Sequence, residues 1–130
     1  MSPNVIAVVD DDDATLQMLD ALLNDAGYQV ISSTSSRDAH QFILRSLPDL
    51  VLLDLWIGEQ RAGIQILDAL SRDASTRDIP VIVCSGQVDY LRMQAPLFRA
   101  LGYQILEKPF QPPRLLAQIE AALQRWPPTN

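Results

Sequence analysis

Five short apolar runs divide the chain, and a longer segment that mixes polar and apolar residues follows each of them. Runs of about four to eight residues that are rich in Val, Ile and Leu are typical of strands buried on both faces of a sheet. We therefore predict strands at "VIAVV", "YQVIS", "DLVLLDL", "IPVIVCS" and "YQILE", which are residues 5–9, 28–32, 49–55, 79–85 and 103–107.

The segments that follow these runs carry helical signals. In the first of them the apolar residues recur at helical spacing: Leu16, Leu19, Leu23 and Ala26. Gly27 fits the position after that helix, and Ser35 with Asp38 resembles a capping box that opens a helix ending near residue 46. Further helices are expected after Gly63, over about 89–101 and over 111–126. Pro96 is expected to interrupt the helix that contains it, because proline lacks a backbone N–H.

Strand and helix units in regular succession predict an α/β fold. Parallel strands joined by helices form a sheet covered on both faces, and right-handed crossovers arrange the helices as a doubly wound sandwich. In such sheets, ligands bind beyond the carboxyl ends of the strands, where the strand order reverses. Functional residues are therefore expected directly after the strands.

Composition narrows the class of protein. A chain of 130 residues with 48% hydrophobic residues is expected to form one domain with a packed core. Its formal net charge of −6 argues against direct binding to nucleic acid, whose phosphates require a basic surface. The single cysteine, Cys84, allows no internal disulfide and fits a reducing compartment. We see no secretory signal and no apolar run of about 18 residues, so we predict a soluble, cytoplasmic protein or protein fragment without a membrane partner.

Polar residues whose side chains could bind a ligand or take part in a reaction stand at the ends of four of the five predicted strands. Asp10 and Asp11 follow the first strand, Asp54 ends the third, Ser85 ends the fourth and Lys108 follows the fifth. Crowded carboxylates raise each other's pKa, and a divalent cation such as Mg²⁺, which favours carboxylates and water, relieves that repulsion. A metal ion, a carboxylate nucleophile, a lysine and a hydroxyl are the parts needed to accept and stabilise a phosphoryl group.

Each of these residues also has an ordinary structural interpretation. Acidic residues before a helix are often N-caps and partners of the helix dipole, and we favour that role for Asp12 and Asp13. Ser85 alone would be a common strand-end residue, and Lys108 alone a solvated surface lysine. Asp54 inside an apolar run is harder to explain, because an unpaired buried charge is costly. The combination at several strand ends favours a binding site.

Four blocks of sequence are informative through their order and spacing: "VIAVVDD", "DLVLLDL", "PVIVCSG" and "EKPF". They resemble the receiver domain of response regulators in bacterial two-component systems, over nearly the whole chain. The resemblance implies a flavodoxin-like fold whose parallel strands have the order 2-1-3-4-5. It also implies a receiver domain over 1–126, followed by a tail or the start of a linker at 127–130.

The same resemblance implies a function for the strand-end residues. Asp54 would be the phosphoacceptor, and Ser85 and Lys108 would bind phosphoryl oxygens, with Pro109 in the cis form positioning Lys108. The donor would be a phosphohistidine on a histidine kinase or a phosphotransfer protein. Phosphorylation would switch an output surface for a downstream domain or protein, and the domain would lose the phosphate by itself without being a turnover enzyme.

The resemblance implies a Mg²⁺ site as well. Asp11 and Asp54 would bind the ion directly, and Asp10 would act mainly through water. The backbone carbonyl of Trp56 would complete the protein ligands. No other cofactor is implied.

The sequence departs from the family pattern at two positions that matter. Gly58 stands where the family usually has proline, and Ile105 stands where it often has an aromatic residue that reports phosphorylation by swinging inward. The chemistry is expected to be intact while the common output switch is altered. An alternative is therefore an interaction module that keeps the fold but switches without phosphate. A Mg²⁺-dependent phosphatase is a further alternative, but Trp56 stands where such enzymes need a second aspartate.

Overall fold

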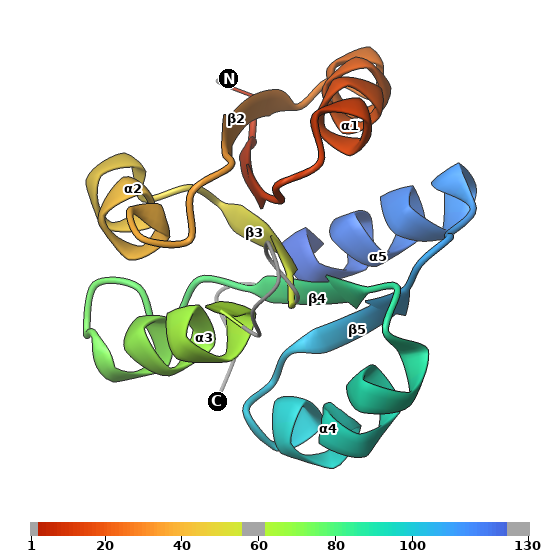
Figure 1. Cartoon of the computed structure of the whole chain (residues 1–130). Coiled ribbons are helices and arrows are strands. Elements are labelled where there is room, and N and C mark those ends of the chain that lie inside the picture. The colour runs from red at the N-terminus through yellow and green to blue at the C-terminus, as the bar shows by residue number, and fades with distance from the viewer. Residues whose placement is uncertain (1–2, 56–61, 125–130) are drawn as a thin grey trace.

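The computed structural model describes residues 3–55 and 62–124 of the chain. These residues form one parallel sheet in the order β2-β1-β3-β4-β5, with helices packed around it (Figure 1). The strands are β1 (Val5–Val9), β2 (Gln29–Ser33), β3 (Leu50–Asp54), β4 (Val81–Ser85) and β5 (Gln104–Glu107). The predicted α/β class, parallel direction and strand order are confirmed.

A helix follows each strand. The helices are α1 (Asp13–Asp25), α2 (Ala39–Ser46), α3 (Ala62–Arg72), α4 (Val88–Ala100) and α5 (Pro112–Gln124). Within the described residues, none of these helices combines the length and the apolarity that crossing a lipid bilayer requires.

Two hydrophobic clusters lie on opposite faces of the sheet. Alternate residues of β1 divide between them: Ala7 and Val9 join the cluster that contains side chains of α2, α3 and α4. Ile6 and Val8 join the cluster built with α1 and α5. Because side chains alternate across a strand, a central strand covered by helices on both faces has no position for an exposed polar residue. This is why the central strands are recognisable as continuous apolar runs.

The ends of α1 agree with the prediction. Asp12 is its N-cap residue, and Ala26 is its C-cap. Gly27 follows with a φ of 96°, a left-handed conformation that glycine adopts without steric strain. The chain can therefore turn directly from α1 into β2.

The second helix begins later than predicted. The Oγ of Ser35 accepts a hydrogen bond from the backbone N–H of Asp38 at 3.4 Å, so the expected capping contact is present. The helix itself starts only at Ala39, and the side chain of Asp38 makes no capping hydrogen bond. The Ser35 contact thus closes a turn before the helix instead of the first turn of the helix.

Two predictions about helix interiors are wrong. Pro96 lies inside α4, and the helix continues through it. Leu91, on the N-terminal side of the proline, and Phe98, on its C-terminal side, are both buried, so packing against the sheet holds the helix continuous despite the missing hydrogen bond. Gly63 does not precede the third helix but lies within it, since α3 begins at Ala62.

Candidate functional site

The acidic site begins at the carboxyl end of β1. Asp10 is 3% exposed, its backbone N–H donates to the carbonyl of Ser33, and its Oδ1 accepts the backbone N–H of Asp12 at 3.0 Å. These contacts fix the Asp10 side chain where the strand turns into α1. Asp11 is exposed at the same end.

The next aspartate has the structural role that the sequence favoured. Asp12 caps α1, because its carboxylate accepts hydrogen bonds from both the hydroxyl and the backbone N–H of Thr15. Those two hydrogen bonds hold the pKa of Asp12 below its usual value. Asp13 lies in the first turn of α1, where a negative charge interacts favourably with the helix dipole.

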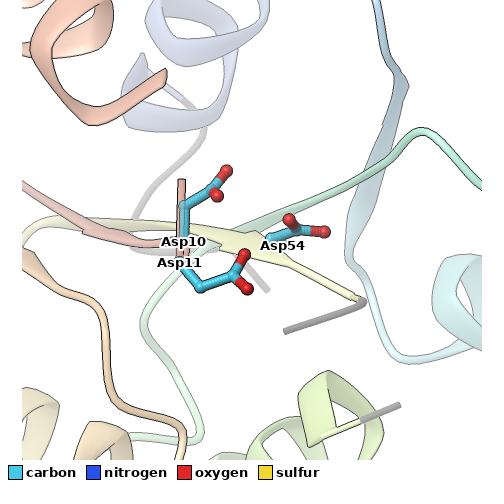
Figure 2. Close-up of side chains that lie close together, drawn as sticks. All are labelled: Asp10, Asp11 and Asp54. Carbon is cyan, nitrogen blue, oxygen red and sulfur yellow. The ribbon is translucent and has the colours of Figure 1, made fainter. Parts of the chain in front are cut away.

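Three carboxylates converge at this edge of the sheet. Asp10 and Asp11 follow β1, Asp54 ends the neighbouring strand β3, and the carboxylate groups lie close together in Figure 2. One oxygen from each lies within 4.8 Å of the others. Hard divalent cations such as Mg²⁺ prefer a small set of oxygen ligands of this kind. The three residues that sequence analysis grouped are therefore brought together by the fold.

Lys108, the only lysine in the sequence, faces two of these carboxylates. Its Nζ lies 2.6 Å from Oδ2 of Asp10 and 3.2 Å from Oδ2 of Asp54. Burial by itself lowers the pKa of Lys108. The hydrogen bond to Asp10 and the negative charges of Asp54 and Asp10 together outweigh burial, so this pKa is raised. The lysine is therefore a protonated cation at neutral pH.

The backbone of β4 and β5 positions this lysine. The backbone N–H of Lys108 donates to the carbonyl of Ser85 at 2.9 Å, which continues the pairing of β5 with β4 by one residue. The peptide bond between Lys108 and Pro109 is cis. Ser85 is fully buried, and its Oγ accepts the backbone N–H of Gln87 at 2.9 Å. Ser85 thus lies at the end of the strand next to Asp54. Trp56, whose backbone carbonyl was predicted to bind Mg²⁺, lies outside the described residues.

Gly63, to which the sequence analysis gave no role at the site, packs closely against the end of β3. A Cβ atom at Gly63 would lie 2.6 Å from the Cα of Leu55 and 2.8 Å from the backbone oxygen of Asp54. Real Cβ atoms do not approach other atoms so closely, so only glycine lets α3 pack against the end of β3. The available signal was a glycine near the start of a predicted helix, a position that good helix formers normally occupy.

Cys84 precedes Ser85 and belongs to the core. It is 3% exposed, and burial raises the pKa of its thiol to about 12, so no thiolate forms at neutral pH. Cys84 is thus a small core residue with a free thiol.

Comparison with known proteins decides the family. Residues 6–120 match the sequence model of the response regulator receiver domain. The chain belongs to this family. The receiver domain is 35% identical over 130 residues to the phosphate regulon transcriptional regulatory protein PhoB of Pseudomonas aeruginosa, covering 98% of this chain and 55% of PhoB. It is 31% identical over 121 residues to protein Rrf1 of Nitratidesulfovibrio vulgaris, covering 93% of this chain and 83% of Rrf1.

Solved structures agree with the sequence comparison. The receiver domain superposes on NtrX from Brucella abortus with a TM-score of 0.79 and 28% identity, covering 94% of this chain and 26% of that one. The chain thus spans about half the length of PhoB and about a quarter of NtrX.

The acidic pocket of this receiver domain is typical of a phosphoacceptor site. It consists of Asp10, Asp11 and Asp54 with Lys108 beside them. Receiver domains have histidine kinases as partners, and they are phosphorylated by kinases and are not turnover enzymes. The predicted family and receiver function are confirmed, while the roles of the individual residues stay predictions.

Proposed function

We propose that Asp54 accepts a phosphoryl group from the phosphohistidine of a histidine kinase or a phosphotransfer protein. A carboxylate oxygen of Asp54 attacks phosphorus, the P–N bond breaks, and the imidazole leaves with the electron pair of that bond. The product on this chain is an acyl phosphate. The observation that supports the proposal best is an acceptor carboxylate grouped with two other carboxylates and a lysine at neighbouring strand ends.

Mg²⁺ fits the donors at this site. We expect Asp11 and Asp54 to hold the ion directly, together with the backbone carbonyl of Trp56, which lies outside the described residues. Asp10 is expected to act mainly through water, because it is buried and its oxygens already accept hydrogen bonds from Lys108 and the N–H of Asp12. The bound ion would neutralise charge on the phosphoryl oxygens.

Lys108 and Ser85 supply the remaining contacts in this proposal. The position of Lys108 Nζ, 3.2 Å from Oδ2 of Asp54, supports a role as the cation for a phosphoryl oxygen. The Oγ of Ser85 accepts the N–H of Gln87, which leaves its own hydrogen to donate to a second phosphoryl oxygen. Pro109, in the cis form, sets the direction of the chain directly after Lys108.

The output of the domain follows from the same contacts. Ile105 is partly buried against the core at the position where the family often has a mobile aromatic residue. We infer that phosphorylation is signalled through Ser85 and the residues after it to a downstream output domain or protein. Residues 1–126 would form this domain and 127–130 a tail or the start of a linker. We place the domain in the cytoplasm, without direct contact to nucleic acid.

Direct phosphorylation tests the proposal. Acetyl phosphate or phosphoramidate with Mg²⁺ should add one phosphoryl group to the protein, measured by intact mass spectrometry, and chelation of Mg²⁺ should prevent the addition. Asp54→Asn should abolish it. Asp13→Asn is a matched control, because Asp13 is an exposed aspartate of α1. Equal labelling of the Asp54 variant and the control would refute the assignment. No labelling of the wild type by either donor would favour the phosphorylation-independent interaction module.

A further inference from the structure

A small pocket of about 230 Å³ lies between α2 and α3. Figure 1 shows these two helices as neighbours, and residues of both helices and of the turn before α2 line the pocket. Asp10, Asp11, Asp54 and Lys108 are not among the lining residues, so the pocket is distinct from the acidic site.

The polar side of this pocket carries a positive charge. Arg37, Ser36, His40 and Gln65 line it, and no acidic residue does. Arg37 is exposed and forms no ion pair within the described part of the chain. Its guanidinium is therefore available to an anionic ligand, with a hydroxyl and an amide as further hydrogen-bond donors beside it.

The carboxylates next to the pocket have other partners. Oδ2 of Asp38 lies 3.5 Å from the hydroxyl of Ser35. Oδ2 of Asp73 faces Nε2 of His40 at 3.6 Å. The side chain of Asp38 also makes no capping hydrogen bond to α2, so the positive end of this helix dipole adds to the charge of Arg37. An incoming anion therefore meets a locally positive surface.

The other side of the pocket is apolar. It is formed by three residues of α3, namely Ala62, Ile66 and Ala69. The short alanine side chains leave the space that the pocket occupies. Pockets for drug-sized ligands have volumes from about 300 Å³ upward, so the occupant of this one is smaller. The apolar side suits a hydrocarbon chain of a few carbon atoms.

We propose that this pocket binds a small organic acid with one carboxylate and a short hydrocarbon chain. The guanidinium of Arg37 binds both carboxylate oxygens, as planar guanidinium groups commonly do. The hydrocarbon chain lies against Ile66 and the two alanines. This inference goes beyond phosphoryl transfer, and it holds whether or not Asp54 is phosphorylated.

Inorganic phosphate fits the pocket less well than such an acid. Phosphate has no hydrocarbon part for the apolar side, and placing charged oxygens against apolar side chains without hydrogen bonds is unfavourable. A carboxylate on a short chain matches both sides at once.

Nuclear magnetic resonance of His40 tests the proposal. His40 is the only histidine in the sequence and lines the pocket, so its imidazole C–H signals report on binding there. Sodium butyrate, added at constant pH and ionic strength, should shift these signals to a plateau in the millimolar range, because one ion pair and a small apolar contact give modest affinity. Butyramide, the neutral analogue of the same size, should bind more weakly.

Substitutions separate the two sides of the pocket. Arg37→Gln should weaken butyrate binding about fivefold, the effect of losing one partly exposed ion pair. Arg45→Gln is the matched control, because it removes the same charge from an exposed residue of α2 outside this pocket. Ala69→Leu should abolish binding by filling the pocket while every charge remains. Ala69 is partly exposed and leucine is a good helix former, so α3 should tolerate this change.

Several results would overturn this assignment. They are a shift that never reaches a plateau, equal weakening by Arg37→Gln and Arg45→Gln, and wild-type binding by Ala69→Leu. Equally tight binding of butyramide would show that the carboxylate is not recognised, and equally tight binding of inorganic phosphate would show a site for anions in general. Either result would also overturn the assignment. Asp54→Asn should bind butyrate like the wild type, so failure of phosphorylation would leave this test intact.

Discussion

Lys108 lies closer to Asp10 than to Asp54. Its Nζ is 2.6 Å from the carboxylate of Asp10 and 3.2 Å from that of Asp54. Lys108, which follows β5, thus links the ends of β1 and β3. Its positive charge compensates the negative charges of two buried carboxylates. An aspartate without such compensation would be costly to bury. Lys108 is therefore expected to stabilise the fold as well as to bind a phosphoryl oxygen.

Lys108→Met should reduce the free energy of unfolding in metal-free buffer by about 3 kcal/mol, because it leaves two buried carboxylates without their cation. Mg²⁺ should recover part of the loss. Urea unfolding in EDTA and in MgCl₂ measures both effects. Arg72→Met is the control, since Arg72 pairs with Asp68 on the surface at 79% and 59% exposure and should contribute little. Equal losses in the two variants would contradict the role of Lys108.

The contribution of Lys108 should depend on pH in a defined direction. The pKa of Lys108 is raised in the folded protein above the value of about 10.4 expected for an unfolded chain. The stabilisation by Lys108 is therefore complete below about pH 10. It decreases above that pH, because the lysine loses its proton in the unfolded state before it does so in the folded state, and it is absent above the pKa of the folded state. As the chain has a single lysine, one ¹³Cε lysine resonance reports this pKa by NMR. Asp10→Asn should lower the pKa of Lys108, and an unchanged pKa would refute the pairing of Lys108 with Asp10.

Gly63→Ala should destabilise the protein by about 1–3 kcal/mol, because the added Cβ would lie 2.6 Å from the Cα of Leu55 and force α3 away from β3. Gly86→Ala is a matched control near the same site. There the nearest atom is the Cβ of Lys108 at 3.9 Å, an ordinary contact, so the unfolding free energy should not fall. Thermal unfolding of both variants checks the difference. Equal destabilisation would show that close packing at Gly63 is not the cause.

The sequence predicted the sheet well because its central strands are buried on both faces. β1 was predicted at its observed ends, 5–9. At β4 the predicted run began at Ile79, but the strand starts at Val81, because the run includes Pro80, which lacks the N–H that sheet pairing requires. The positions of the strand ends also predicted the acidic site, because neighbouring parallel strands bring their carboxyl ends together.

Other features depend on distances that no local pattern contains. The close approach of Gly63 to Leu55 follows from the packing of α3 on the end of β3, and the preference of Lys108 for Asp10 follows from the side-chain geometry after β5. The continuity of α4 through Pro96 is a tertiary effect, because the core contacts of the helix outweigh its local sequence preference. Sequence thus predicted which residues meet but not how they contact one another.

Phosphorylation should change the loop after β4 more than β5. Ser85 is expected to turn its hydroxyl toward a phosphoryl oxygen, and the amides of residues 86–89 should respond, because Gln87 is hydrogen-bonded to that hydroxyl. Tyr103 is buried and should keep its side-chain conformation. Amide chemical shifts with and without beryllofluoride measure the change. A large rotation of Tyr103 in a structure with beryllofluoride would show that the signal travels through β5 instead.

Asp11 and Asp10 should differ in their importance for Mg²⁺ binding. Asp11 is exposed, whereas Asp10 is buried and already bonded to Lys108 and to the N–H of Asp12, so Asp11 is the better direct ligand. Asp11→Ala should therefore weaken Mg²⁺ binding, measured by isothermal titration calorimetry, more than Asp10→Ala. Without metal, Asp11→Ala should raise the melting temperature, because it removes like-charge repulsion from the cluster. Equal affinities in the two variants would show that both aspartates bind the ion alike, and a lower metal-free melting temperature would show that Asp11 stabilises the fold.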